Sequence, residues 1–308
     1  MTPSGTRSQE DMFNQAAQTA DSERFWKRLA RIDQLPTLPL IVQRLRDAVE
    51  NPASDARTIA DLIENDPAIM ARMMKVVNSA FYRGFGEITS LQDAVVRLGM
   101  HTVFNIAVST SVFSTFPPRE GVEFNRFAFW KHSIQVAVGT EVLSSHLGVQ
   151  DRKNLRRDVL HLTGLLHDMG KIIFEQYFHD EFTEALLLSR QQDMPLHRAE
   201  RQVIGADHGA VGAWLGEHWQ LPAEVWHAIR WHHAPEQTQS TPYTLLGLTA
   251  ASNEIVNFGG LSSGGDIKPG TVSHSERLGL NEEDCLALAE AIGSAAEKSF
   301  LMQELLDE

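Results

Sequence analysis

The chain has 308 residues, of which 43% are hydrophobic and 22% are charged. Such a chain can bury a substantial core, and the composition excludes bulk disorder, a collagen-like chain and a disulfide scaffold. The formal net charge of −13 argues against a general nucleic-acid binder, because phosphate contacts need clustered Lys and Arg. The chain has one cysteine, no signal-peptide pattern and no apolar run near the roughly 20 residues of a membrane span, so we expect a cytoplasmic protein.

Residues 1 to about 22 are polar and lack periodicity, which predicts a tail. Apolar residues at helical spacing then predict a first helical block over residues 23–123. Within it, Pro36 and Pro39 precede a helix, Ser54 or Asp55 caps a second, and Pro67 opens a third. Two further helices are expected, one that starts at Ser90 and ends at Gly99 and one over about 102–115.

A second block, residues 124–260, is also predicted to be helical throughout. The predicted helices span about 126–147, 158–178, 180–192, 199–219, 222–233 and 242–258. After it, residues 261–308 are expected to form a flexible Gly- and Ser-rich loop, which starts near 259, and an acidic helix from Asn281. Residues 281–308 hold eight acidic residues and one lysine, so much of the net charge belongs to this last helix. We expect that helix to pack on the bundle through Leu288 and Ile292, with a dimer contact as the alternative.

Histidines are concentrated in the second block, which holds eleven of the thirteen. His167-Asp168 lies in an otherwise apolar segment, where two polar groups are costly to bury unless something satisfies them. Such a pair can offer a nitrogen and carboxylate oxygens to a metal ion, and the carboxylate can bridge two ions. Lys171, four residues after His167, could neutralise a substrate phosphate.

Four more histidines lie at helical spacing from apolar residues: His132, His208, His232 and His233. Each alone is more typical of a core residue, but four helices that each bring a ligand type to their inward side predict a metal site inside a bundle. Mixed imidazole and carboxylate ligands suit iron, manganese, zinc or nickel, as one or two ions. The remaining histidines, including His146, His161 and His197, have no partner at ligand spacing.

These residues and several short motifs resemble the HD superfamily of metal-dependent phosphohydrolases, and more closely its HDOD branch. The segments that carry the resemblance are Leu35-Pro36-Thr37-Leu38-Pro39, Asn65-Asp66-Pro67, Trp130-Lys131-His132-Ser133, Gly164-Leu165-Leu166-His167-Asp168-Met169-Gly170-Lys171, Asp207-His208, Trp219-Gln220-Leu221-Pro222 and His232-His233-Ala234-Pro235. The resemblance implies an all-α fold, with an N-terminal helical subdomain packed on an HD-like helical bundle. It also implies a role in bacterial signal transduction.

The chain departs from the family pattern at one ligand. The resemblance places the last HD ligand, normally aspartate, at Asn253, whose neutral oxygen would bind an ion more weakly. It aligns His132, His167, Asp168, His208, His232 and His233 with the other ligands. Lys171 matches a phosphate-contacting lysine of the HD-GYP relatives, which hydrolyse cyclic di-GMP, although the Gly-Tyr-Pro motif itself is absent.

The sequence therefore leaves two alternative functions open. One is a regulatory module that binds a signalling protein or a small phosphate ligand and forms an oligomer in some settings. The other is a metal-dependent phosphohydrolase or phosphodiesterase, with Asp168 and Lys171 in catalytic roles and a metal-activated water as nucleophile. Neither a membrane nor bulk nucleic acid is expected as a partner.

Overall fold

In the computed structural model of the protein, the described residues are 20–32, 40–78, 87–116, 124–152, 155–238, 244–261, 264–267 and 269–298. The predicted tail up to residue 19 and the Leu35–Pro39 segment lie outside these residues. Within the described part the chain is helical and contains no strand, as the all-α prediction requires. No helix there is both long and apolar enough to cross a membrane.

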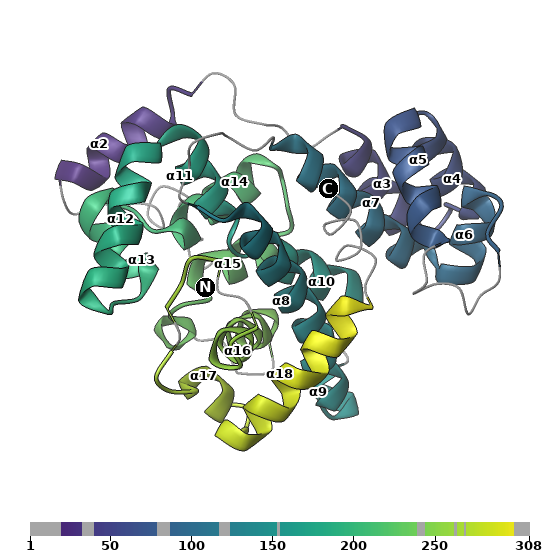
Figure 1. The fold of residues 1–308 in the computed structure, drawn as a ribbon. Coiled ribbons are helices and arrows are strands. Elements are labelled where there is room, and N and C mark those ends of the chain that lie inside the picture. Colours follow the sequence, from purple (N-terminus) through teal and green to yellow (C-terminus); the bar gives the residue numbers. More distant parts are fainter. Residues whose placement is uncertain are drawn as a thin grey trace, which may run out of the picture.

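Helices α3 to α7 form the N-terminal group on one side of the molecule (Figure 1). Their bounds are α3 Leu40–Glu50, α4 Ala56–Glu64, α5 Pro67–Val77, α6 Leu91–Leu98 and α7 Met100–Thr115. Local chemistry explains where two of them begin: the side chain of Asp55 accepts a hydrogen bond from Thr58 N, and that of Ser90 from Asp93 N.

The second group is the larger bundle. Its helices are α8 Arg126–His146, α9 Val149–Arg152, α10 Arg157–Leu166, α11 Met169–Tyr177, α12 His179–Gln192, α13 Leu196–Val203, α14 His208–His218, α15 Ala223–Trp231, the 3-10 turn η2 Pro235–Gln237 and α16 Leu245–Phe258. Helix α8 packs against α10 and α16, and α14 packs against α11 and α15. The bundle core continues into the N-terminal group where α10 contacts α7.

Helix α2, Ala20–Leu29, packs on this second bundle and not on the N-terminal group. The ring of Phe25 lies 5.8 Å from that of Phe174 and 4.7 Å from that of Phe178, and Arg28 pairs with Glu181 at 2.5 Å. Helix α2, which the sequence grouped with the first block, thus packs against an aromatic face of the second bundle.

Two predicted helices are each broken in two. The helix expected over 158–178 stops at Leu166 and restarts at Met169, and the one expected over 199–219 stops at Val203 and restarts at His208. The second break contains Gly205 at φ +91°, where the backbone lies against α2. Both breaks fall at predicted ligands, which places these side chains at helix ends and not in the middle of an inward stripe.

The C-terminal elements α17, Ser273–Glu276, and α18, Glu282–Glu297, pack back onto the bundle. Helix α18 contacts α8 and α16, and Ile292 is fully buried, as expected for docking. Asn281 and Asp284 form a capping box at its start. The buried carboxylate of Glu254 on α16 accepts hydrogen bonds from the backbone nitrogens of the first turn of α17.

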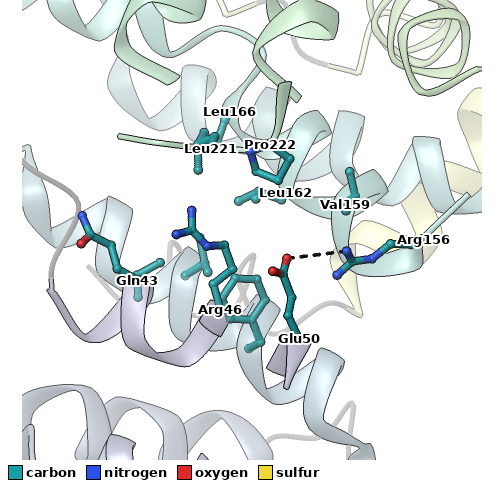
Figure 2. A pocket seen from close by; sticks show the side chains of 12 residues that line it. Gln43, Arg46, Glu50, Arg156, Val159, Leu162, Leu166, Leu221 and Pro222 are labelled. Atoms are coloured by element: carbon teal, nitrogen blue, oxygen red, sulfur yellow. Dashed lines mark ion pairs between the residues drawn. The ribbon is translucent and has the colours of Figure 1, made fainter. Parts of the chain in front are cut away.

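A cavity that is partly open to solvent lies where α3 and α7 of the N-terminal group face α10 (Figure 2). Its walls are mostly apolar, and Leu166 at the end of α10 is one of the lining residues. At its rim an ion pair of 3.7 Å between Glu50 and Arg156 links the two groups of helices.

Candidate metal centre

Asp168 lies at the centre of the site, in the break between α10 and α11. Its Oδ2 lies 3.6 Å from Nε2 of His132 and 3.4 Å from Nε2 of His167. Its Oδ1 lies 3.1 Å from Nε2 of His208 and 3.6 Å from Nε2 of His232. All five side chains are fully buried, so one carboxylate is surrounded by four imidazoles away from bulk water.

The candidate ligand atoms form two groups that share this carboxylate. One group is Asp168, His208, His232 and His233, and the other is His132, His167 and Asp168; within each, the atoms lie within 4.8 Å of one another. A carboxylate whose two oxygens face two separate imidazole groups has the geometry of a bridge between two ions.

Hydrogen bonds on the far side of two of these rings set their tautomers. Nδ1 of His167 lies 2.8 Å from the carbonyl oxygen of Gly164, and Nδ1 of His232 lies 2.7 Å from that of Ile229. A carbonyl only accepts, so Nδ1 carries the proton and the lone pair is on Nε2. Neither Nε2 has a hydrogen-bond partner among the described residues. Lone pairs directed at a carboxylate repel it unless a cation lies between them, so these residues fit a metal ion.

Glu200 orients His208 in the same way, a role that was not predicted from the sequence. Its Oε2 lies 2.7 Å from Nδ1 of His208 and accepts the backbone N–H of the same residue at 2.8 Å. Burial raises the pKa of Glu200. Burial alone would lower the pKa of His208, but the carboxylates of Glu200 and Asp168 raise it to about 10. The only indication in the sequence was a single glutamate next to Ala199, a residue that is buried on α13. Without the fold, this indication is too weak to identify Glu200 as a partner of His208.

Three of the imidazoles, those of His132, His232 and His233, are held neutral by burial. Burial lowers the pKa of His132 and of His232 to about 4 and that of His233 well below its ordinary value. Nε2 of His233 lies 2.8 Å from Nε2 of His208. Neutral imidazole is the form that binds metals, so these residues are in the competent state at neutral pH.

His197 belongs to the surroundings of the site, although the sequence offered it no partner. Its ring stacks on that of His233 with centroids 4.2 Å apart, and burial lowers the pKa of His197 to about 3. His197 lies on α13 and is not at helical spacing from His233, so this contact could not be predicted from the sequence. By contrast, His146 contacts the carbonyl oxygen of Val142 within its own helix, and His161 contacts Glu141 of the neighbouring helix α8.

Lys171 is fully buried, and its ammonium group lies between two carboxylates. Nζ donates to Oδ2 of Asp168 at 2.7 Å and to Oδ2 of Asp266 at 2.6 Å. Burial disfavours the charged amine, but the two carboxylates outweigh it and raise the pKa of Lys171. Gly264 and Asp266, which belong to the segment expected to be a flexible loop, lie at the site.

Asn253 is buried on α16, and its Oδ1 accepts a hydrogen bond from Asn257 Nδ2 at 3.0 Å. An amide pair within α16 thus occupies the position where the resemblance places the last ligand. The structure brings together the six other predicted ligands and Lys171. The role of Asn253 as a ligand stays a prediction.

The helical architecture and the buried histidine–aspartate centre define an all-α domain of HD type. The HDOD domain family matches residues 35–235, which is more than half of the chain. The protein belongs to the HDOD domain family.

Similar proteins support the same fold. An uncharacterized protein of Treponema pallidum (strain Nichols) is 26% identical over 232 residues, or 74% of this chain and 43% of that protein. The chain thus spans less than half the length of that relative. An HDOD domain protein of unknown function from Geobacter sulfurreducens is 23% identical, with a TM-score of 0.74 over 90% of this chain and 97% of the other.

Two other crystal structures carry functional names. A candidate signal transduction protein from Marinobacter aquaeolei VT8 has a TM-score of 0.74 at 23% identity, over 94% of this chain and 66% of that one. A candidate phosphohydrolase from Shewanella amazonensis SB2B has a TM-score of 0.68 at 23% identity, over 94% and 99%. At this identity the likeness concerns the fold.

Proposed function

We propose that this protein is a metal-binding HDOD regulatory module of bacterial signal transduction. The observation that carries the metal-binding half is the orientation of the imidazoles: His167 and His232 bond to carbonyl oxygens through Nδ1 and direct Nε2 at the buried carboxylate of Asp168. His132 and His167 would hold one divalent ion and His208, His232 and His233 a second, with Asp168 common to both. Such ions polarise phosphoryl oxygens and lower the pKa of bound water.

The regulatory half of the proposal rests on how the site is closed. Lys171, the residue that would meet a substrate phosphate, is fully buried and bonded to two carboxylates. A hydrolase needs that ammonium to be accessible to substrate, whereas a module that reports metal occupancy to a protein partner does not. The name of the similar structure from Marinobacter agrees with a signalling role but does not identify the partner.

The second candidate is a metal-dependent phosphohydrolase, favoured by the shared carboxylate of Asp168 and by Lys171 within 2.7 Å of it. In that reaction Lys171 would offset phosphate charge, and Asp168 would position the attacking water next to the ions. A phosphate ester, nucleotide or cyclic dinucleotide would be the substrate class.

The test is to purify the protein without chelator and measure iron, manganese, zinc and nickel by elemental analysis. We expect at least one of these metals in the wild type and in His146→Ala, a matched control on α8 outside the cluster. We expect none in the double variant His167→Ala/Asp168→Ala. Absence of all four metals from the wild type, followed by failure to bind added ions, would refute the metal-binding proposal.

Turnover separates the two candidates. The metal-loaded wild type is assayed with bis(p-nitrophenyl) phosphate and with cyclic di-GMP. The regulatory proposal expects no hydrolysis above that of the double variant. Hydrolysis by the wild type and the His146→Ala control, but not by the double variant, would establish the enzyme instead.

A further inference from the structure

Residues 264–266, which follow α16 in the chain, lie directly against the candidate metal centre. A Cβ atom added to Gly264 would lie 3.3 Å from Cδ2 of His132 and 3.5 Å from Oδ2 of Asp168. Gly264 and Gly265 have φ values of +49° and +97°, in the left-handed region that favours glycine. Gly264 therefore lets this backbone approach the buried ligands more closely than a residue with a side chain would.

The next residue, Asp266, places its carboxylate on Lys171. The Nζ–Oδ2 distance is 2.6 Å, the Asp266 side chain is 7% exposed and that of Lys171 is fully buried. This contact joins residues 95 positions apart, and a second carboxylate, Asp168, lies on the same ammonium at 2.7 Å. Asp266 therefore takes a second hydrogen-bonding position on the Lys171 ammonium, beside Asp168.

A carboxylate oxygen at this distance from an ammonium group makes the same charge-assisted hydrogen bond that a phosphate oxygen would make. Asp266 and a phosphate-bearing ligand compete for Lys171 and also repel each other, because both are negative and the surroundings are buried. A neutral residue in place of Asp266 would remove that repulsion and would leave the Lys171–Asp168 pair in place.

We propose that Asp266 is an internal occupant of the anion position at Lys171, and that it excludes phosphate-bearing ligands while residues 264–266 lie against the centre. This inference rests on the proposed function in one respect: Lys171 is taken to face the ligand side of the metal centre. Asp266 thereby becomes the residue that determines whether this HDOD domain accepts a phosphate ligand.

The test measures binding of inorganic phosphate by titration calorimetry to chelator-treated wild type, Asp266→Asn and Asp193→Asn. Asp193 is an exposed aspartate at the end of α12, so its variant makes the same charge change away from Lys171. We expect Asp266→Asn to bind phosphate about tenfold or more tightly than the wild type, because the substitution removes a like-charge contact in a buried site. Asp193→Asn should match the wild type, and Lys171→Met added to Asp266→Asn should abolish the gain.

Equal phosphate affinity in wild type, Asp266→Asn and Asp193→Asn would overturn the proposal, as would a gain in affinity that survives Lys171→Met.

A second measurement needs no variant. Hydrogen exchange of the amides of residues 264–267 in the wild type should become faster at saturating phosphate, and unchanged exchange would contradict the displacement of this segment. Metal content is measured on the same proteins before chelator treatment. A phosphate gain in protein that binds no metal would refute the proposed function alone, and metal binding without a phosphate gain would refute the role of Asp266 alone.

Discussion

Oε2 of Glu200 lies 2.7 Å from Nδ1 of His208 and 2.8 Å from the backbone nitrogen of the same residue, so one buried carboxylate fixes both the ring and its helix end. A carboxylate behind a histidine ligand raises the basicity of the ring and sets its tautomer.

We expect Glu200→Gln to weaken metal binding about 10- to 100-fold, in line with the loss of other partners of this kind. Competition with a fluorescent chelator measures the affinity. Glu184→Gln, at an exposed glutamate on α12, is the matched control and should retain wild-type affinity. Equal affinity in all three proteins would mean that Glu200 only stabilises the fold.

The two groups of ligand atoms predict how metal stoichiometry depends on the residue removed. His132 belongs to one group only and His233 to the other, whereas Asp168 belongs to both. We therefore expect His132→Ala and His233→Ala each to lose one bound ion from a two-ion site, and Asp168→Asn to weaken both. Calorimetric titration with Mn²⁺ gives the stoichiometry. A wild-type protein that saturates at one ion would rule out the bridged arrangement.

Gly170, at the start of α11, allows the two helix ends of the site to meet. A Cβ atom at this position would lie 2.1 Å from the backbone oxygen of His208, which cannot move without displacing α14. We expect Gly170→Ala to lower the free energy of unfolding by roughly 3 kcal/mol or more, as overpacking of a tight interior does. Gly270→Ala, where an added Cβ meets nothing within 4 Å, should change it little. Urea unfolding of the two variants measures the difference.

The buried histidines should make the metal-free protein less stable in mild acid. Burial lowers the pKa of His132 and His232 from 6.5 to about 4, so between these values the unfolded chain binds protons that the folded protein does not. Their contribution to stability is present above pH 6.5 and is lost as the pH falls toward 4, by roughly 2 kcal/mol each between pH 7 and pH 5.

His208 acts in the opposite direction, because its pKa is raised, but its contribution changes by only about 1 kcal/mol over that range. Urea midpoints of chelator-treated protein at pH 7, 6 and 5 should therefore decline. The His132→Ala variant should show a shallower decline, and a pH-independent midpoint in the wild type would contradict the assignment of neutral buried rings.

Local patterns were enough to predict most of the helices and several of their ends. Ser90 and Asn281 cap helices because their side chains reach a backbone nitrogen three residues on, which is a purely local interaction. Helical spacing also placed His132 on the inward side of α8, where it is fully buried. These predictions needed no knowledge of which helices are neighbours.

The breaks at His167-Asp168 and before His208 could not be predicted from spacing, since apolar residues continue on both sides of each. The contact of Lys171 with Asp266 was missed for a different reason. It joins residues 95 positions apart, and a Gly-rich segment gives no periodic signal that would indicate its destination. Interactions of this kind depend on the assembled bundle, and only the structure reveals them.

Leu166 lines the cavity where α10 faces the N-terminal helices, and the residue bonded to it is His167. A change in how α3 packs at this junction would thus act on α10 one peptide bond away from a candidate ligand. The two halves of the protein share this helix end. A change at their boundary that shifts the end of α10 would therefore also shift His167 and the geometry of the buried centre.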